Sequence, residues 1–265
     1  MKIGQLADFF YQIAPLNLQE EYDNAGLITG HPETEIKGIL IALDSTEDVI
    51  LEAVKYGCNL VIAHHPIVFK GLKKINGHHY VERAIISAIK NDIAILALHT
   101  NLDNVYQHGV NQKIAEKLDL RDTEILLPKS GVSHAGQPVG AGMSGFLPMS
   151  MATTSFLNYV KSKLELKVLK HTHLCKNDIR KVAVCGGSGS FLIPKAIQSQ
   201  ADVYITSDLK YHEYFEADHN IILLDIGHFE SEKYTNELLY GLIMNNFSNF
   251  AVRLTETVTN PVHYY

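Results

Sequence analysis

Histidine and carboxylate residues follow three apolar stretches of the sequence. His64 and His65 follow the run NLVIA, Asp103 lies shortly after IAILAL, and His228 and Glu232 follow NIILLDI. Neutral imidazole and carboxylate together suit Zn, Mn, Fe, Co or Ni, whereas a set of oxygen ligands alone would suit Mg or Ca. These five residues are therefore the predicted ligands of a metal site. The alternative is that they are ordinary loop residues at strand ends.

The spacing of these residues suits two neighbouring metal ions better than one. Side chains that are adjacent in an extended chain point in opposite directions, so His64 and His65 are expected to serve different ions. His228 and Glu232 are four residues apart and share a face if a helix begins there. Asp103 and Glu232 are then the predicted bridging carboxylates of a two-metal site.

Three further polar residues near the strand ends are candidate catalytic groups, and each has an ordinary structural interpretation. His99 could orient a metal ligand, or it could be a core histidine whose ring is satisfied. Asp208 could transfer protons or cap a helix. Glu230 could be a general base, although an acid in the first turn of a helix is also favoured by the helix dipole.

Two segments are candidate phosphate-binding sites. Lys70, Lys73 and Lys74 lie in one loop after His65 and could attract phosphate, or could simply be solvated. The turn GGSGS, with Gly187 and Ser188, could cradle an anion with its N–H groups. It lacks the complete glycine pattern of dinucleotide sites and the GK[ST] of a P-loop, so a tight turn explains it equally.

Strand-like and helix-like segments alternate along the chain, which predicts an α/β fold with a mostly parallel sheet. The expected strands are 36–43, 59–65, 93–99, 179–187, 201–208, 220–228 and 250–254. The expected helices are 45–57, 78–92, 151–166, 190–200, 208–218 and 230–246. Segment 122–178 is otherwise less regular, with a possible bulged strand at 139–148. Ligands in such folds bind beyond the carboxyl ends of the strands, where the predicted metal ligands lie.

The two halves of the chain have matching spacing. Ile36 and Ile179 begin equivalent strands, and Asn59 and Asp202 begin the next pair, 23 positions later in each half. This predicts one domain, residues 1–265, made of two similar intertwined lobes, approximately 1–130 and 131–265. The alternative is that any two strand–helix–strand units look alike.

The composition is that of a folded protein without a membrane segment. The chain has 265 residues, of which 46% are hydrophobic and 20% charged, and no apolar run approaches the roughly 20 residues that span a bilayer. The N-terminus predicts an amphipathic helix and not a signal peptide, so a cytoplasmic location is expected. A net charge of −6 without a basic cluster argues against nucleic-acid binding. The three widely spaced cysteines predict neither disulfides nor a thiolate zinc site.

Several motifs occur in the order seen in the Nif-three-like family, the GTP cyclohydrolase I type 2 homologues. They are YDNAGL, AHHPIVFKGLKKI, HTNLDN, GGSGS, YITSDLKYHE and GHFESE. The resemblance covers essentially the whole chain. It implies two intertwined α/β lobes, a dinuclear site between them with His64, His65, Asp103, His228 and Glu232 as ligands, and ring-shaped homohexamers. The length resembles the short form, without the inserted CutA-like domain. Tyr22 replaces the usual Trp, and Ser207 stands where Gly is common.

Two functions are compatible with these observations. The first is a metal-dependent hydrolase that acts on a nucleotide or related heterocycle, with GTP as the candidate that the resemblance names. The second is a non-enzymatic metal chaperone or regulatory metal-binding protein, which the lack of a distinct general acid or substrate motif favours. The ligand set does not distinguish among Zn, Fe, Mn, Co and Ni.

Overall fold

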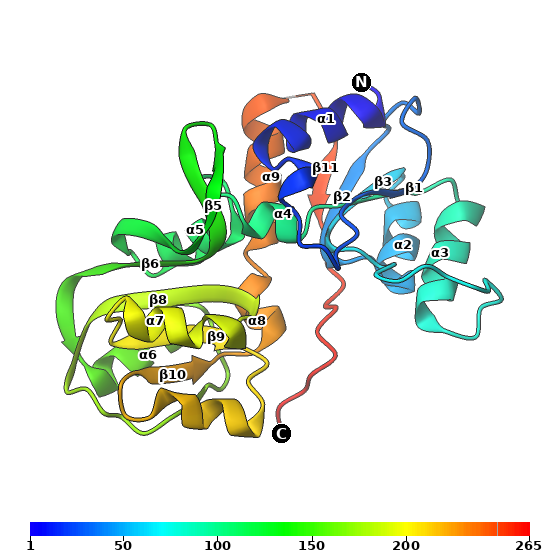
Figure 1. The fold of residues 1–265 in the computed structure, drawn as a ribbon. Helices are drawn as coiled ribbons and strands as arrows, with labels where there is room; N and C mark the ends of the chain where they lie inside the picture. The colour runs from blue at the N-terminus through cyan, green and yellow to red at the C-terminus, as the bar shows by residue number, and fades with distance from the viewer. Residues whose placement is uncertain (248) are drawn as a thin grey trace. The chain divides into compact units, whose positions relative to one another are not determined.

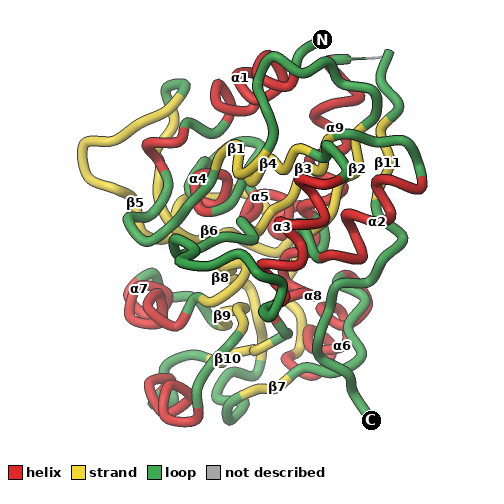
Figure 2. The backbone as a smooth tube through the Cα atoms, turned by 90° about the vertical axis from the view of Figure 1, so that its right-hand side faces the viewer, coloured by secondary structure: helices red, strands yellow, loops and turns green. Residues whose placement is uncertain are grey.

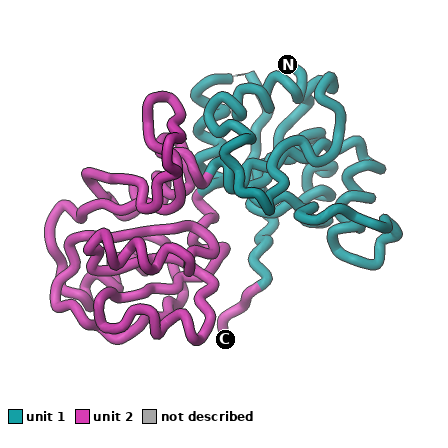
Figure 3. The backbone as a smooth tube through the Cα atoms, in the orientation of Figure 1, with its two compact units in different colours: residues 1–102, 235–261 teal, residues 103–234, 262–265 magenta. Residues whose placement is uncertain are grey.

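The chain forms two compact units, each built around its own β-sheet (Figures 1 and 3). The fold is that of a computed structural model, which describes residues 1–247 and 249–265. Unit 1 comprises Met1–Leu102 and Thr235–Pro261, and unit 2 comprises Asp103–Tyr234 and Val262–Tyr265. The predicted lobes, approximately 1–130 and 131–265, are a different division of the chain and remain a prediction.

The sheet of unit 1 has five strands in the order β1-β4-β3-β2-β11. Their bounds are Gly26–Thr29 (β1), Ile39–Asp44 (β2), Leu60–His65 (β3), Ala94–Ala97 (β4) and Val252–Leu254 (β11). Strands β11, β2, β3 and β4 run parallel, and β1 is antiparallel to β4. The carboxyl ends of β2, β3 and β4 therefore meet at one edge of the sheet.

Helices cover this sheet and bury its central strands. They are α1 (Ile3–Ile13), η1 (Leu16–Leu18), α2 (Glu47–Lys55), α3 (Tyr80–Lys90) and α9 (Thr235–Asn246). Buried side chains of α2 and α3 pack in one cluster with those of β2, β3 and β4. In Figure 1, α2 and α3 lie on one side of the sheet, and α1 and α9 on the other. Because both faces are covered, nearly every residue of β2, β3 and β4 is buried, as is typical of parallel strands.

The sheet of unit 2 has six strands in the order β5-β6-β8-β9-β10-β7. Their bounds are Arg121–His134 (β5), Gln137–Ala152 (β6), Lys170–His171 (β7), Asp178–Ser188 (β8), Val203–Ser207 (β9) and Ile222–Asp225 (β10). Strands β8, β9 and β10 are parallel neighbours (Figure 2), and the other pairings are antiparallel. Unit 1 thus has four adjacent parallel strands and unit 2 has three, and the prediction of a mostly parallel α/β fold is confirmed.

Short helices follow the strands of unit 2 and complete its core. They are α5 (Val110–Lys117), α6 (Thr153–Lys163), η2 (Ser190–Leu192), α7 (Ile193–Gln198), η3 (Tyr211–Ala217) and α8 (His228–Glu232). Tyr204 of β9 is fully buried and packs with Ile193 of α7 and Ala217 of η3. Helix α4 (Thr100–Asp103) contains the boundary between the units. No helix in the described ranges is long and apolar enough to cross a membrane.

Three sequence expectations were wrong in detail. The helix expected at 208–218 is the 3-10 helix η3. The helix expected at 230–246 is divided into α8 and α9, which belong to different units. The segment predicted to be less regular contains the long β5–β6 hairpin, in which β6 includes the strand expected at 139–148 and β5 was not predicted. Most residues of β5 are exposed or half-buried, so it lacks the continuous apolar run that reveals a buried strand.

Candidate metal centre

Three imidazole rings lie together at the strand ends of unit 1. His64 and His65 close β3, and His99 follows β4, the next parallel strand. The ring centroids are 4.9 Å apart for His64 and His65, 5.2 Å for His64 and His99, and 5.4 Å for His65 and His99. One possible ligand atom of each residue lies within 4.8 Å of those of the other two. Unit 1 therefore presents a histidine group that could hold a metal ion.

The expectation that His64 and His65 point in opposite directions was wrong. Their ring centroids are only 4.9 Å apart, with the ring planes tilted by 47°. The expectation assumed a continuing pleated strand, but His65 is the last residue of β3 and Pro66 follows it. Side-chain alternation holds only within the extended strand, so adjacent residues at its end can converge.

The Nδ1 atom of each of these three histidines is bound by an oxygen. The distances are 2.8 Å from His64 to the Leu98 carbonyl, 2.8 Å from His65 to Asp44 Oδ1, and 2.7 Å from His99 to Asp23 Oδ1. A carbonyl oxygen can only accept, so His64 Nδ1 donates its proton to Leu98. With Nδ1 protonated, a neutral imidazole carries its lone pair on Nε2, which is the form that binds metal ions.

Asp44 and Asp23 support the site, although neither was predicted from the sequence to be functional. Asp44 closes β2, where it is the register partner of His65. Burial opposes ionisation of Asp44, but hydrogen bonds from His65 and Thr259 and the histidine charge lower its pKa. Burial acts in the same way on Asp23, yet hydrogen bonds from His99, Thr100 and Asn24 lower its pKa to about 2. Their signals were present: Asp44 directly follows an apolar strand, and Asp23 lies in the YDNAGL motif.

Unit 2 contains a second group, His228 and Glu232, at opposite ends of helix α8. His228 Nε2 lies 3.0 Å from Glu232 Oε2, and His228 Nδ1 lies 2.6 Å from Asp208 Oδ2. The predicted sharing of one helix face is therefore confirmed. Glu232 is 3% exposed, so its carboxylate is withdrawn from solvent. An imidazole nitrogen and a buried carboxylate oxygen are donor types that divalent transition metals bind.

Gly187 makes room for this pair. It has a φ of +64°, and a Cβ atom there would lie 2.3 Å from Glu232 Oε1 and 3.5 Å from His228 Cε1. Its N–H donates to Ser231 Oγ at 2.9 Å, and its carbonyl accepts from Ser207 Oγ at 2.6 Å. The absence of a side chain at Gly187 therefore leaves space for the Glu232 carboxylate. The Gly187 N–H donates to Ser231 Oγ in this structure, and not to a phosphate.

Asp103 and Glu232 share an electrostatic environment in unit 2. Burial, together with the negative charges of Asp103 and Glu232, raises the pKa of the Cys185 thiol to about 12, although a hydrogen bond with Tyr204 opposes this effect. Asn111 Nδ2 donates to the Asp103 carbonyl at 3.1 Å. Neutral imidazoles with withdrawn carboxylates are the donor chemistry of a divalent transition metal, so these residues fit such an ion.

The family model for Duf34/NIF3 (NGG1p interacting factor 3) matches residues 1–261. The chain belongs to this family. It is 32% identical over 269 residues to the GTP cyclohydrolase 1 type 2 homolog of Campylobacter jejuni, and the match covers 100% of both chains. It is 39% identical over 235 residues to the homolog of Clostridium perfringens, covering 88% of this chain and 87% of the relative. A solved structure of a Staphylococcus aureus hypothetical protein is similar, with a TM-score of 0.91, 30% identity, and coverage of 100% and 99%.

The remaining predicted residues of this Duf34/NIF3 chain lie outside the histidine group of unit 1 and the His228–Glu232 pair. Lys70, Lys73 and Lys74 are exposed in the loop between β3 and α3. Glu230 is in the first turn of α8, where a Cβ on Gly227 would meet its carboxylate at 2.3 Å and the Tyr264 hydroxyl at 3.2 Å. Ser188 is the last residue of β8. Asp208 is the orienting partner of His228, and a role for these residues in substrate binding or catalysis remains a prediction.

Proposed function

We propose that the protein holds two divalent transition-metal ions per chain and acts as a metal-dependent hydrolase on a nucleotide or related heterocycle. The proposed ligands are His64, His65, Asp103, His228 and Glu232. One observation carries the proposal: His64, His65 and His228 each have Nδ1 bound to a carbonyl or carboxylate oxygen. Metal-binding histidines characteristically have such an outer partner, which sets the tautomer and orients the ring.

The protein residues have separable tasks in this proposal. The bound ions would supply Lewis-acid chemistry, activating water and polarising the bond to be hydrolysed. His64 and His65 act as neutral donors, and Asp103 and Glu232 supply the negative charge that balances the ions. Asp44 and Asp208 hold the rings of His65 and His228 in position. The same carboxylates accept hydrogen bonds from Nδ1, which leaves Nε2 of each neutral ring as the donor atom for the metal.

A nucleotide is the proposed substrate class because the relatives are named GTP cyclohydrolase 1 type 2 homologs. For GTP, the reaction would hydrolyse the imidazole ring of guanine at C8 and release formate. The exposed Lys70, Lys73 and Lys74 would attract the triphosphate. We also propose that the protein works in the cytoplasm as a homo-oligomer, a hexamer by family resemblance; light scattering would measure its mass.

The test is formate release from GTP by anaerobically reconstituted protein, with Zn, Fe, Mn, Co or Ni in turn. His64→Ala is the inactive comparison, and metal content is measured in each sample. Turnover that requires metal and is lost in His64→Ala would support the hydrolase. Two bound metals per chain without turnover on GTP or a panel of nucleotides and phosphoesters would overturn the hydrolase and favour metal handling. Failure to bind metal would overturn both.

A further inference from the structure

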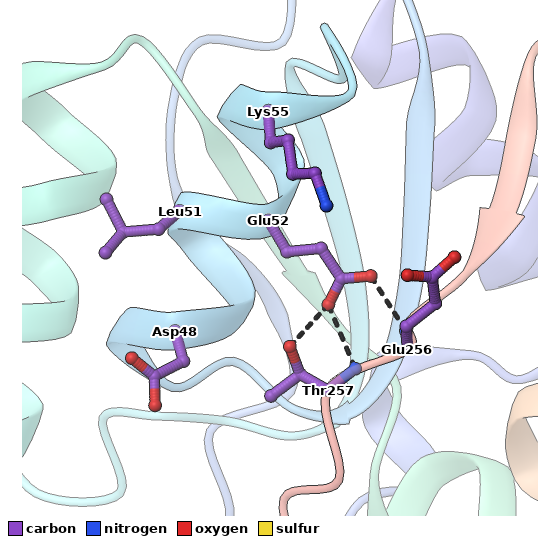
Figure 4. Close-up of a pocket in the computed structure, with 6 residues that line it drawn as sticks. All are labelled: Asp48, Leu51, Glu52, Lys55, Glu256 and Thr257. Atoms are coloured by element: carbon purple, nitrogen blue, oxygen red, sulfur yellow. Dashed lines mark hydrogen bonds between the residues drawn. The ribbon is translucent and has the colours of Figure 1, made fainter.

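The chain segment after strand β11 is held against unit 1 by a buried acid, Glu52 of α2. Glu52 accepts hydrogen bonds from Thr255 Oγ1 at 2.6 Å and from the Glu256 N–H at 2.7 Å. It also accepts from the N–H and the hydroxyl of Thr257, at 3.1 Å and 2.6 Å. Figure 4 shows Glu52 between helix α2 and this segment, with Thr257 beside its carboxylate. Both carboxylate oxygens are used, so residues 255–257 are fixed to α2.

The same segment is held again two residues later, at the metal-ligand edge of the sheet. Thr259 Oγ1 donates to Asp44 Oδ2 at 2.6 Å, across 215 positions of sequence. The other oxygen of that carboxylate, Oδ1, lies 2.8 Å from His65 Nδ1. Asp44 is therefore clamped between a hydroxyl of the C-terminal segment and the imidazole of a proposed ligand. Thr259, Asp44 and His65 all belong to unit 1.

We propose that residues 255–259 form a strap and that Thr259 is a positioning residue for His65, acting through Asp44. The inference rests on the proposed metal site. An aspartate can rotate about its terminal bond, so a hydrogen bond at one oxygen also sets the direction of the other. The Thr259 hydroxyl fixes Oδ2, and this directs Oδ1 at His65 Nδ1. Removing the hydroxyl leaves the carboxylate free to turn toward water, and the imidazole loses its fixed orientation.

Hydrogen bonds to α2 and β2 fix the path of residues 255–259 after strand β11. Four hydrogen bonds to Glu52 fix the segment before it reaches Asp44. Thr259 then arrives at the carboxylate from a pre-ordered backbone, so its hydroxyl is presented at a small further cost in conformational entropy. Glu52 therefore anchors the strap, and Thr259 is its functional contact.

The experiment uses cobalt(II) titration of the full-length, metal-free protein, followed by calorimetry and by the visible absorption of the bound ion. Thr259→Val removes the hydroxyl while keeping the shape, and Thr259→Ser restores it. Thr257→Val is the matched control, because it removes one hydroxyl from the strap at Glu52, where three hydrogen bonds remain, and leaves the contact with Asp44 intact. Loss of a partner outside the ligands typically weakens metal binding about 10–100-fold. Thr259 contacts Asp44 and not the ligand itself, so we expect Thr259→Val to weaken cobalt binding by about 3–10-fold.

The supporting result is a weaker affinity and an altered cobalt spectrum in Thr259→Val, with both restored in Thr259→Ser and unchanged in Thr257→Val. Melting temperatures show whether each variant is folded. If Thr259→Val does not fold, Asp44→Asn tests the contact between Asp44 and His65 through which Thr259 would act. An unaltered cobalt spectrum in Asp44→Asn would overturn the inference. If folded Thr259→Val had the wild-type cobalt spectrum, the inferred role of Thr259 would be overturned and the proposed metal site would stand. Absence of cobalt binding by the wild type would overturn the proposed metal site and the inference with it.

Discussion

His228 Nε2 lies 3.0 Å from Glu232 Oε2, with the two residues four positions apart on helix α8. Two further residues, Asp208 and Gly187, determine how this pair is positioned. Asp208 lies 2.6 Å from the other ring nitrogen of His228, and Gly187 leaves space for the glutamate. An imidazole and a buried carboxylate this close can act as ligands of one ion, and each of the four residues makes a separate contribution that can be measured.

Replacing Glu232 by Gln is expected to weaken metal binding by more than about 10-fold, because the amide keeps the shape of the side chain but removes its negative charge. Calorimetric titration with zinc and cobalt would measure the change. Glu216→Gln, an exposed position of η3, is the control for loss of one charge elsewhere in unit 2. Equal affinities for Glu232→Gln and Glu216→Gln would contradict the assignment of Glu232 as a ligand.

Replacing Asp208 by Asn is expected to lower metal affinity by about 10–100-fold without removing a ligand. The amide cannot accept the His228 Nδ1–H with the strength of a carboxylate, so the ring loses orientation and basicity. Cobalt absorption is the sensitive readout because it reports the geometry of the bound ion. If Asp208 only capped the polypeptide turn, the variant would melt at a lower temperature while its affinity for cobalt stayed the same.

Replacing Gly187 by Ala should impair both stability and metal binding. Alanine at positive φ costs about 1–2 kcal/mol, and the added Cβ would lie 2.3 Å from Glu232 Oε1. Gly57→Ala is the matched control, since Gly57 has a φ of +69° but its Cβ would meet no atom within 4 Å. Both variants should lose stability in urea denaturation, whereas only Gly187→Ala should bind zinc less tightly. A loss of zinc affinity in Gly57→Ala as well would point to general strain.

Asp23 should stabilise the fold at neutral pH and lose this contribution in acid. Its pKa in the folded protein is about 2, below the ordinary value of 3.8, so the native state favours the ionised carboxylate. The stabilisation is fully present above 3.8 and is lost as the pH falls through about 2. The difference in unfolding free energy between wild type and Asp23→Asn should therefore shrink as the pH is lowered from about 5 toward 2. Asp8→Asn, at an exposed position of α1, is the control, and a pH-independent difference for Asp23→Asn would contradict the lowered pKa.

The sequence alone determined the elements that carry the site. Strands β2, β3, β4, β9 and β10 are buried, mainly apolar runs with polar residues at or just after their ends, and such local patterns are visible without the fold. For the same reason, His64, His65, His228 and Glu232 could be identified as candidate ligands. The spacing of His228 and Glu232 correctly indicated a shared helix face, because four residues are close to one helical turn.

Only the tertiary structure decided which residues support the rings. Asp23 reaches His99 across 76 positions, Asp44 reaches His65 across 21, and Thr259 reaches Asp44 across 215. Such contacts depend on strand order, on register and on the path of the C-terminal segment, none of which leaves a periodic signal in one sequence. The convergence of His64 and His65 was likewise decided by where β3 ends. Local periodicity reports burial along one element, whereas hydrogen bonds between distant residues exist only after the elements have packed.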